Sequence, residues 1–134
     1  MILTFIIGTR PEFLKVQSVI NELKKDNEIR IKLISTLQQE KLFFKATKNF
    51  NIKIDYWLKA SINKNMDFTF SKLLKDFSEL FKKIKTDIIL VQGDTLTAYV
   101  ASCYAFLNKI TLIHLEAGLR TYNRNAPWPE EIFR

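Results

Sequence analysis

Ionisable side chains cluster in three short turns of the sequence. Each turn comes at the end of an apolar run: GTRPE follows ILTFII near the start, GDT follows DIILVQ, and EAGLR follows the apolar residues of TLIHL. Carboxylates that stand beside lysine or arginine can transfer protons and bind anions, so these turns are candidates for a site. The turns and the residues next to them carry Arg10, Lys15, Asp94, His114, Glu116 and Arg120.

The first turn contains more charge than a helix start requires. Thr9 and Glu12 have the spacing of a capping box, and Pro11 falls in the first helical turn, so these three have a structural explanation. Arg10 and Lys15 do not, because cations at a helix N-terminus oppose the helix dipole. They predict a bound anion, most simply a phosphate. The G-x-G-x-x-G fingerprint is absent, so classical dinucleotide binding is not expected.

The remaining candidates each have a structural alternative. Asp94 either caps the helix that follows it or acts as a functional carboxylate, and the local sequence leaves both open. Glu116 lies near the end of an apolar strand, where a carboxylate must be paired or functional. His114 is more simply a hydrogen-bonded core histidine. Its H-x-E spacing to Glu116 lacks the Pro-Cys-x-x-Cys partner of zinc deaminases, so no metal site is expected.

Short apolar runs alternate along the chain with amphipathic segments, which predicts an α/β fold. We expect strands over 2–7, 29–36, 54–58, 87–93 and 111–118, helices over 11–25, 40–50, 67–85 and 95–108, and a polar loop that starts a helix at Pro129. This pattern predicts a Rossmann-like parallel sheet with helices on both faces. With the common strand order 3-2-1-4-5, the three charged turns converge at the carboxyl edge of the sheet.

Length and composition restrict the class of protein. The chain has 134 residues, a single cysteine and 47% hydrophobic residues, as expected of one cytoplasmic domain. No stretch approaches the ~20 apolar residues of a membrane span. The net charge of +7 comes mostly from scattered lysines without an arginine cluster, so neither nucleic acid nor membrane is an expected partner.

Four motifs in order, GTRPE, VQGDT, HLEAGLRT and PWPEE, carry a resemblance that spans the whole chain. The sequence resembles the N-terminal domain of the non-hydrolysing UDP-N-acetylglucosamine 2-epimerases, which supply bacterial surface polysaccharides. The resemblance implies the N-terminal half of a two-domain GT-B-like fold. It also implies conversion of UDP-N-acetylglucosamine to UDP-N-acetylmannosamine by elimination and re-addition of UDP, with no cofactor, and a homodimer.

The resemblance also assigns roles to residues. It implies that the catalytic carboxylates are Asp94, Glu116 and Glu130, and that the substrate-binding residues are Arg10, Lys15, His114 and Arg120. It does not decide which carboxylate removes the proton from C2 of the sugar. A nucleotide-sugar glycosyltransferase, which shares the fold, should lack the GDT and EAG carboxylates together, whereas this chain has both.

The sequence departs from the family pattern at several places. Gln92 stands where the family usually has histidine, and Phe133 precedes Arg134 where an Asn-Arg pair is common. Leu37, Gln38 and Gln39 replace the usual Gly-Gln-His, so the regulatory substrate site of bacterial members is not expected.

Length is the largest departure, because the family's chains are more than twice as long. We therefore expect residues 1–134 to form an incomplete N-terminal domain without the C-terminal UDP-binding domain, inactive alone. The alternative is a non-catalytic remnant that acts only as a dimerising or partner-binding module.

Overall fold

A five-stranded parallel sheet forms the centre of the computed structural model, which describes residues 1–36, 47–60 and 65–134. The strand order is β3-β2-β1-β4-β5, the common order on which the predicted convergence of the three charged turns depended. Neighbouring strands are parallel throughout. The strands are β1 (Ile2–Ile7), β2 (Arg30–Ser35), β3 (Tyr56–Trp57), β4 (Ile88–Gln92) and β5 (Thr111–Leu115).

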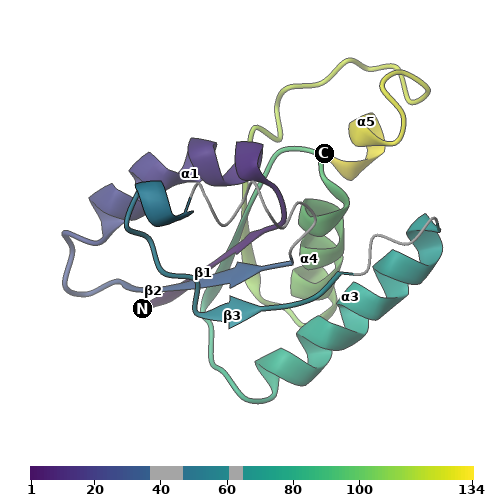
Figure 1. The fold of residues 1–134 in the computed structure, drawn as a ribbon. Coiled ribbons are helices and arrows are strands. Elements are labelled where there is room, and N and C mark those ends of the chain that lie inside the picture. The colour runs from purple at the N-terminus through teal and green to yellow at the C-terminus, as the bar shows by residue number, and fades with distance from the viewer. Residues whose placement is uncertain (37–46, 61–64) are drawn as a thin grey trace.

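Helices cover both faces of the sheet (Figure 1). Helix α1 (Arg10–Leu23) packs on one face, while α3 (Met66–Phe81) and α4 (Leu96–Leu107) pack on the other. A short helix, α5 (Glu130–Phe133), follows the long loop after β5 and begins one residue after Pro129. The predicted Rossmann-like α/β class is confirmed.

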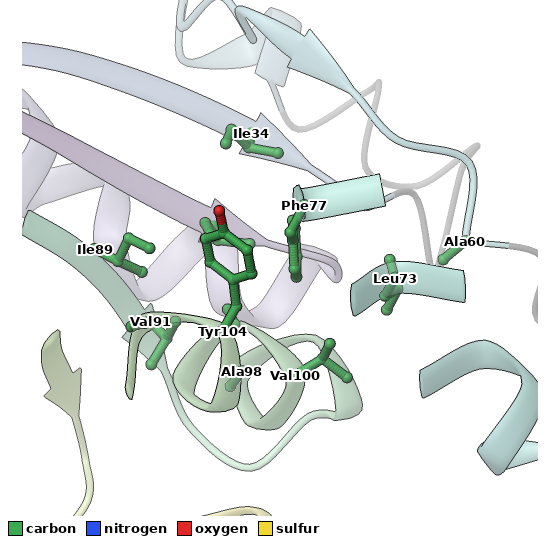
Figure 2. Close-up of a cluster of buried hydrophobic side chains, with 12 residues drawn as sticks. Ile34, Ala60, Leu73, Phe77, Ile89, Val91, Ala98, Val100 and Tyr104 are labelled. Atoms are coloured by element: carbon green, nitrogen blue, oxygen red, sulfur yellow. The ribbon is translucent and has the colours of Figure 1, made fainter. Parts of the chain in front are cut away.

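Alternation of side chains along the strands produces two separate cores. Phe5 and Ile7 point to the face covered by α1, whereas Ile6 between them belongs to the core under α3 and α4. Figure 2 shows the second core, where Phe77 of α3 and Tyr104 of α4 meet over the sheet with their ring centroids 6.1 Å apart. Because β1 and β4 are buried on both faces, the turns that follow them start from fixed points.

The register brings the ends of three strands to one edge. Leu3 pairs with Ile88 between β1 and β4, and Gln92 pairs with Leu115 between β4 and β5. The turns that begin at Gly8, Gly93 and Glu116 therefore leave the sheet at the same carboxyl edge, as expected.

Several predicted boundaries were wrong. Helix α3 ends at Phe81 rather than at 85; Ile84 beyond its end still packs against the second core, so the apolar period continued past the helix. Strand β5 ends at Leu115, because Glu116 adopts a left-handed backbone with φ of 66°. Strand β3 has two residues instead of five. The predicted helix over 40–50 falls mostly on 37–46, outside the described residues.

Candidate active site

The first turn is organised by the buried carboxylate of Glu12. Thr9 is the N-cap of α1, and its hydroxyl accepts a hydrogen bond from the Glu12 amide at 3.5 Å. Glu12 Oε2 accepts hydrogen bonds from the amides of Gly8 (2.9 Å) and Thr9 (2.6 Å). The predicted capping box is thereby confirmed.

Glu12 also connects the first turn to the second. The Thr95 hydroxyl donates to Glu12 Oε1 at 2.6 Å, and the same hydroxyl accepts a hydrogen bond from the Ala98 amide at the start of α4. Burial raises the pKa of Glu12, and the hydrogen bonds that it accepts oppose that rise. The bond from the Ala98 amide makes Thr95 the N-cap of α4, so the alternative that Asp94 caps this helix is wrong.

Glu116 lies where α1, β4 and β5 meet. Its Oε2 accepts a hydrogen bond from Lys15 Nζ at 2.8 Å and another from Gln92 Nε2 at 2.5 Å. Sequence analysis found no structural partner for Lys15, whereas the structure supplies one in Glu116. Gln92 was noted in the sequence only as a departure from the family's usual histidine, and it was not a predicted site residue.

The second turn depends on a left-handed glycine. Gly93 has φ of 72°, and its amide donates to the Leu115 carbonyl at 3.0 Å. Its carbonyl oxygen lies 2.6 Å from His114 Nε2. This contact agrees with the interpretation of His114 as a hydrogen-bonded structural histidine. Through it, His114 holds the turn that carries Asp94.

The chain after β5 is held by a second buried carboxylate, Glu131. Its oxygens accept hydrogen bonds from the amides of Thr121 and Tyr122, both at 3.0 Å, and form an ion pair with Arg120 at 3.1 Å. The amide of Thr121 is the main cause that lowers the pKa of Glu131, and the Tyr122 amide and Arg120 act in the same direction. Glu131 was not among the predicted site residues. Adjacent helical residues point in different directions, so a Glu-Glu pair at a helix start places one carboxylate inward.

Asp94 and Arg134 tie α5 to the second turn. The Arg134 guanidinium donates to Asp94 Oδ2 and to the Leu119 carbonyl. In the same region, the Phe133 ring stacks on Tyr99 of α4, with centroids 5.0 Å apart and planes 19° from parallel. Glu130, the first residue of α5, is thus held near the carboxyl edge as a half-buried side chain.

A family model described as UDP-N-acetylglucosamine 2-epimerase matches residues 21–134. The chain belongs to this epimerase family. It is 40% identical to UDP-N-acetylglucosamine 2-epimerases of Neisseria meningitidis, over 130 residues, and Bacillus subtilis, over 131 residues. Each match covers 96% of this chain but only 35% and 34% of the relatives, so the chain spans about a third of their length.

Solved structures of epimerases have the same fold. The structure of the Neisseria meningitidis UDP-GlcNAc 2-epimerase bound to UDP-GlcNAc matches with a TM-score of 0.94 and 39% identity, over 100% of this chain and 37% of that one. The Acinetobacter baumannii MurG structure matches with a TM-score of 0.65 at 16% identity, over 85% of this chain and 35% of that one. The second likeness concerns the fold alone and agrees with the N-terminal half of a GT-B-like fold.

In this member of the epimerase family, the predicted site residues and the residues that contact them divide into four sets. Lys15, Glu116 and Gln92 form one cluster, and Asp94 with Arg134 forms another beside it. Arg10 is exposed at the start of α1 and forms no hydrogen bond or ion pair with the described residues. His114 and Arg120 both contact protein groups, Gly93 and Glu131 respectively.

Neither a metal cluster nor a membrane span accompanies these groups in the part of the chain that the structure describes. Within residues 1–36, 47–60 and 65–134, no group of three or more His, Cys, Asp or Glu side chains is arranged to hold a metal ion. In the same ranges no helix has the length and apolar character needed to cross a membrane. The sequence departure at 37–39, which concerned a regulatory site, lies outside the described residues.

Proposed function

We propose that this chain is the N-terminal catalytic part of an enzyme that converts UDP-N-acetylglucosamine to UDP-N-acetylmannosamine. The observation that carries the proposal is the geometry of the carboxyl edge. Asp94 and Glu116 follow the adjacent strands β4 and β5, and Glu116 lies 2.8 Å from the Lys15 amine. A Neisseria relative with the same fold, at a TM-score of 0.94, was solved bound to UDP-GlcNAc.

The proposed chemistry uses carboxylates and cations in complementary roles. A carboxylate among Asp94, Glu116 and Glu130 removes the proton from C2, while the bond between C1 and the UDP oxygen breaks and UDP leaves with the electron pair. Return of UDP to C1 and of a proton to the opposite face of C2 completes the epimerisation. No oxidant, reductant or cofactor is needed.

Cations are needed where negative charge develops on the departing diphosphate. Arg10 suits this role because its exposed guanidinium is not engaged by any described residue. The side chain of Lys15 is 53% exposed and keeps N–H donors beyond the one that contacts Glu116. We propose that both contact the substrate phosphates, with His114 and Arg120 as further substrate-binding residues.

We further propose that residues 1–134 belong to an N-terminal Rossmann-like domain that is completed by sequence outside them. The relatives are almost three times as long, and most of the UDP-binding surface is proposed to lie in that additional part. The chain by itself is then inactive, and the working protein is a cytoplasmic homodimer.

A second candidate function is a dimerising module without activity. It is favoured by apolar side chains on and beside the edge strand β5, where Leu112, Ile113, Phe106 and Leu107 are all exposed. Such a surface favours association whether or not the chain is catalytic.

Complementation separates the two candidates. The chain is mixed with the separately expressed C-terminal part of the Neisseria meningitidis relative, and the product is followed by nuclear magnetic resonance (NMR) of the anomeric protons. We expect no turnover by the chain alone and turnover by the mixture. Asp94→Asn should abolish that turnover, while Asp67→Asn, an exposed carboxylate at the start of α3, should not. A folded, associated and inactive mixture would favour the dimerising module.

A further inference from the structure

The two oxygens of the Glu116 carboxylate differ in their surroundings. Oε2 accepts both hydrogen bonds, from Lys15 at 2.8 Å and from Gln92 at 2.5 Å. Oε1 accepts none from the described residues. A carboxylate held in this way has one oxygen fixed by the protein and one free to exchange a proton with a bound molecule.

The donors on Oε2 differ in how firmly they are held. Gln92 is 3% exposed, and its backbone is fixed in the sheet by pairing with Leu115. Lys15 reaches Glu116 through a flexible and half-exposed side chain. The buried amide therefore sets the orientation of the carboxylate, whereas the lysine mainly supplies positive charge.

The backbone at Glu116 has an unusual conformation. Its φ of 66° is a left-handed conformation that is strained for a residue other than glycine. The side chain leaves this turn above Gly93, where a Cβ added to the glycine would lie 4.0 Å from Glu116 Oε2. Of the two hydrogen bonds that the carboxylate accepts, the one from Gln92 comes from the more rigidly held donor.

We propose that Gln92 is a positioning residue for Glu116. The side-chain amide holds Oε2 so that Oε1 faces the substrate and takes or returns the C2 proton. This assignment depends on the proposed epimerase function. An amide does not titrate at ordinary pH, so Gln92 remains a hydrogen-bond donor in both protonation states of the Glu116 carboxyl group.

The first test measures the order of the Glu116 side chain in the chain alone, by carbon-13 relaxation of its methylene groups. We expect an ordered side chain in the unaltered chain, a mobile one in Gln92→Leu, and restored order in Gln92→His, which keeps a ring N–H donor. Gln17→Leu, which removes a glutamine from the solvent side of α1, is the matched control and should leave Glu116 unchanged. Unchanged order in Gln92→Leu overturns the proposal.

The second test measures turnover in the complemented mixture. Loss of a hydrogen bond to a charged group predicts that Gln92→Leu lowers kcat about 10- to 100-fold. KM should change less than about 2-fold, and Gln92→His should recover most of the loss. A mobile Glu116 with unchanged kcat would overturn the positioning role. An inactive mixture before any substitution would instead refute the proposed epimerase function, and with it the catalytic meaning of Gln92.

Discussion

Substitution of Glu12 by alanine should destabilise the fold by about 3 kcal/mol, although Glu12 is not a proposed catalytic residue. The side chain is 1% exposed and accepts three hydrogen bonds from other residues: the amides of Gly8 and Thr9 and the Thr95 hydroxyl. Gly8 and Thr9 belong to the GTRPE turn, and Thr95 belongs to the GDT turn. Loss of the carboxylate should therefore loosen both turns together.

The magnitude follows from the groups that would lose an acceptor. The Thr9 cap itself remains, because the amide of residue 12 still donates to the Thr9 hydroxyl. Each backbone amide left without a buried acceptor costs about 1–3 kcal/mol, while the Thr95 hydroxyl can rotate toward another partner. The burial cost that raises the pKa of Glu12 is relieved at the same time and offsets part of the loss.

Urea unfolding followed by far-ultraviolet circular dichroism at pH 7 measures this effect. With a slope of about 2 kcal/mol per molar urea, the midpoint should fall by about 1.5 M. Glu22→Ala, an exposed change on the same helix, should alter stability by less than about 0.5 kcal/mol. A loss below about 1 kcal/mol for Glu12→Ala would refute the role of Glu12 as the link between the turns.

Three further predictions concern the groups that hold the site. Because the pKa of Glu12 is raised above 4.5 in the folded state, protonation of Glu12 stabilises the fold; this stabilisation is complete below pH 4.5 and is lost as pH rises through the folded pKa. Urea unfolding at a series of pH values should therefore show that the free energy of unfolding of the unaltered chain increases relative to that of Glu12→Gln as pH falls. The pKa of Glu131 is lowered in the folded state, so the ionised carboxylate stabilises the fold above pH 4.5, and this stabilisation is lost as pH falls through the folded pKa. Glu131→Gln should therefore destabilise the chain at pH 7 and reduce the loss of stability at acid pH, as measured in the same assay. Gly93→Ala should cost about 1–2 kcal/mol because φ is 72°, whereas Gly118→Ala, with no atom within 4 Å of the added Cβ, should change the unfolding free energy by less than about 0.5 kcal/mol; equal effects of the two glycine substitutions would contradict this reasoning.

The fold was largely predictable because apolar periodicity and turn residues report on it directly. The alternation of strands and helices and the capping box at Thr9 and Glu12 followed from local patterns, whereas the strand order was assumed as the common one for this class of fold. The ends of elements were not predictable to the residue. Ile84 continues the apolar period after α3 has ended, since burial does not require a helix.

The candidate site was predictable as a set of segments but not as a set of contacts. Sequence analysis found the three turns, yet it could not show that Lys15 reaches Glu116, 101 positions further along the chain. It also could not separate Thr95 from Asp94 as the helix cap, because both residue types cap helices well. Gln92 and Glu131 were missed since their roles depend on burial at particular points of the tertiary structure.

Solvent deuterium incorporation at C2 of the sugar tests the central claim most directly. The complemented mixture is incubated with UDP-N-acetylglucosamine in deuterium oxide and examined by proton NMR. We predict loss of the C2 proton signal together with formation of UDP-N-acetylmannosamine. In Asp94→Asn the signal should be lost at least 100-fold more slowly, which corresponds to an activation barrier about 2.7 kcal/mol higher. Retention of the C2 proton throughout, with the mixture folded and associated, would contradict the proposal that carboxylates at this edge remove it.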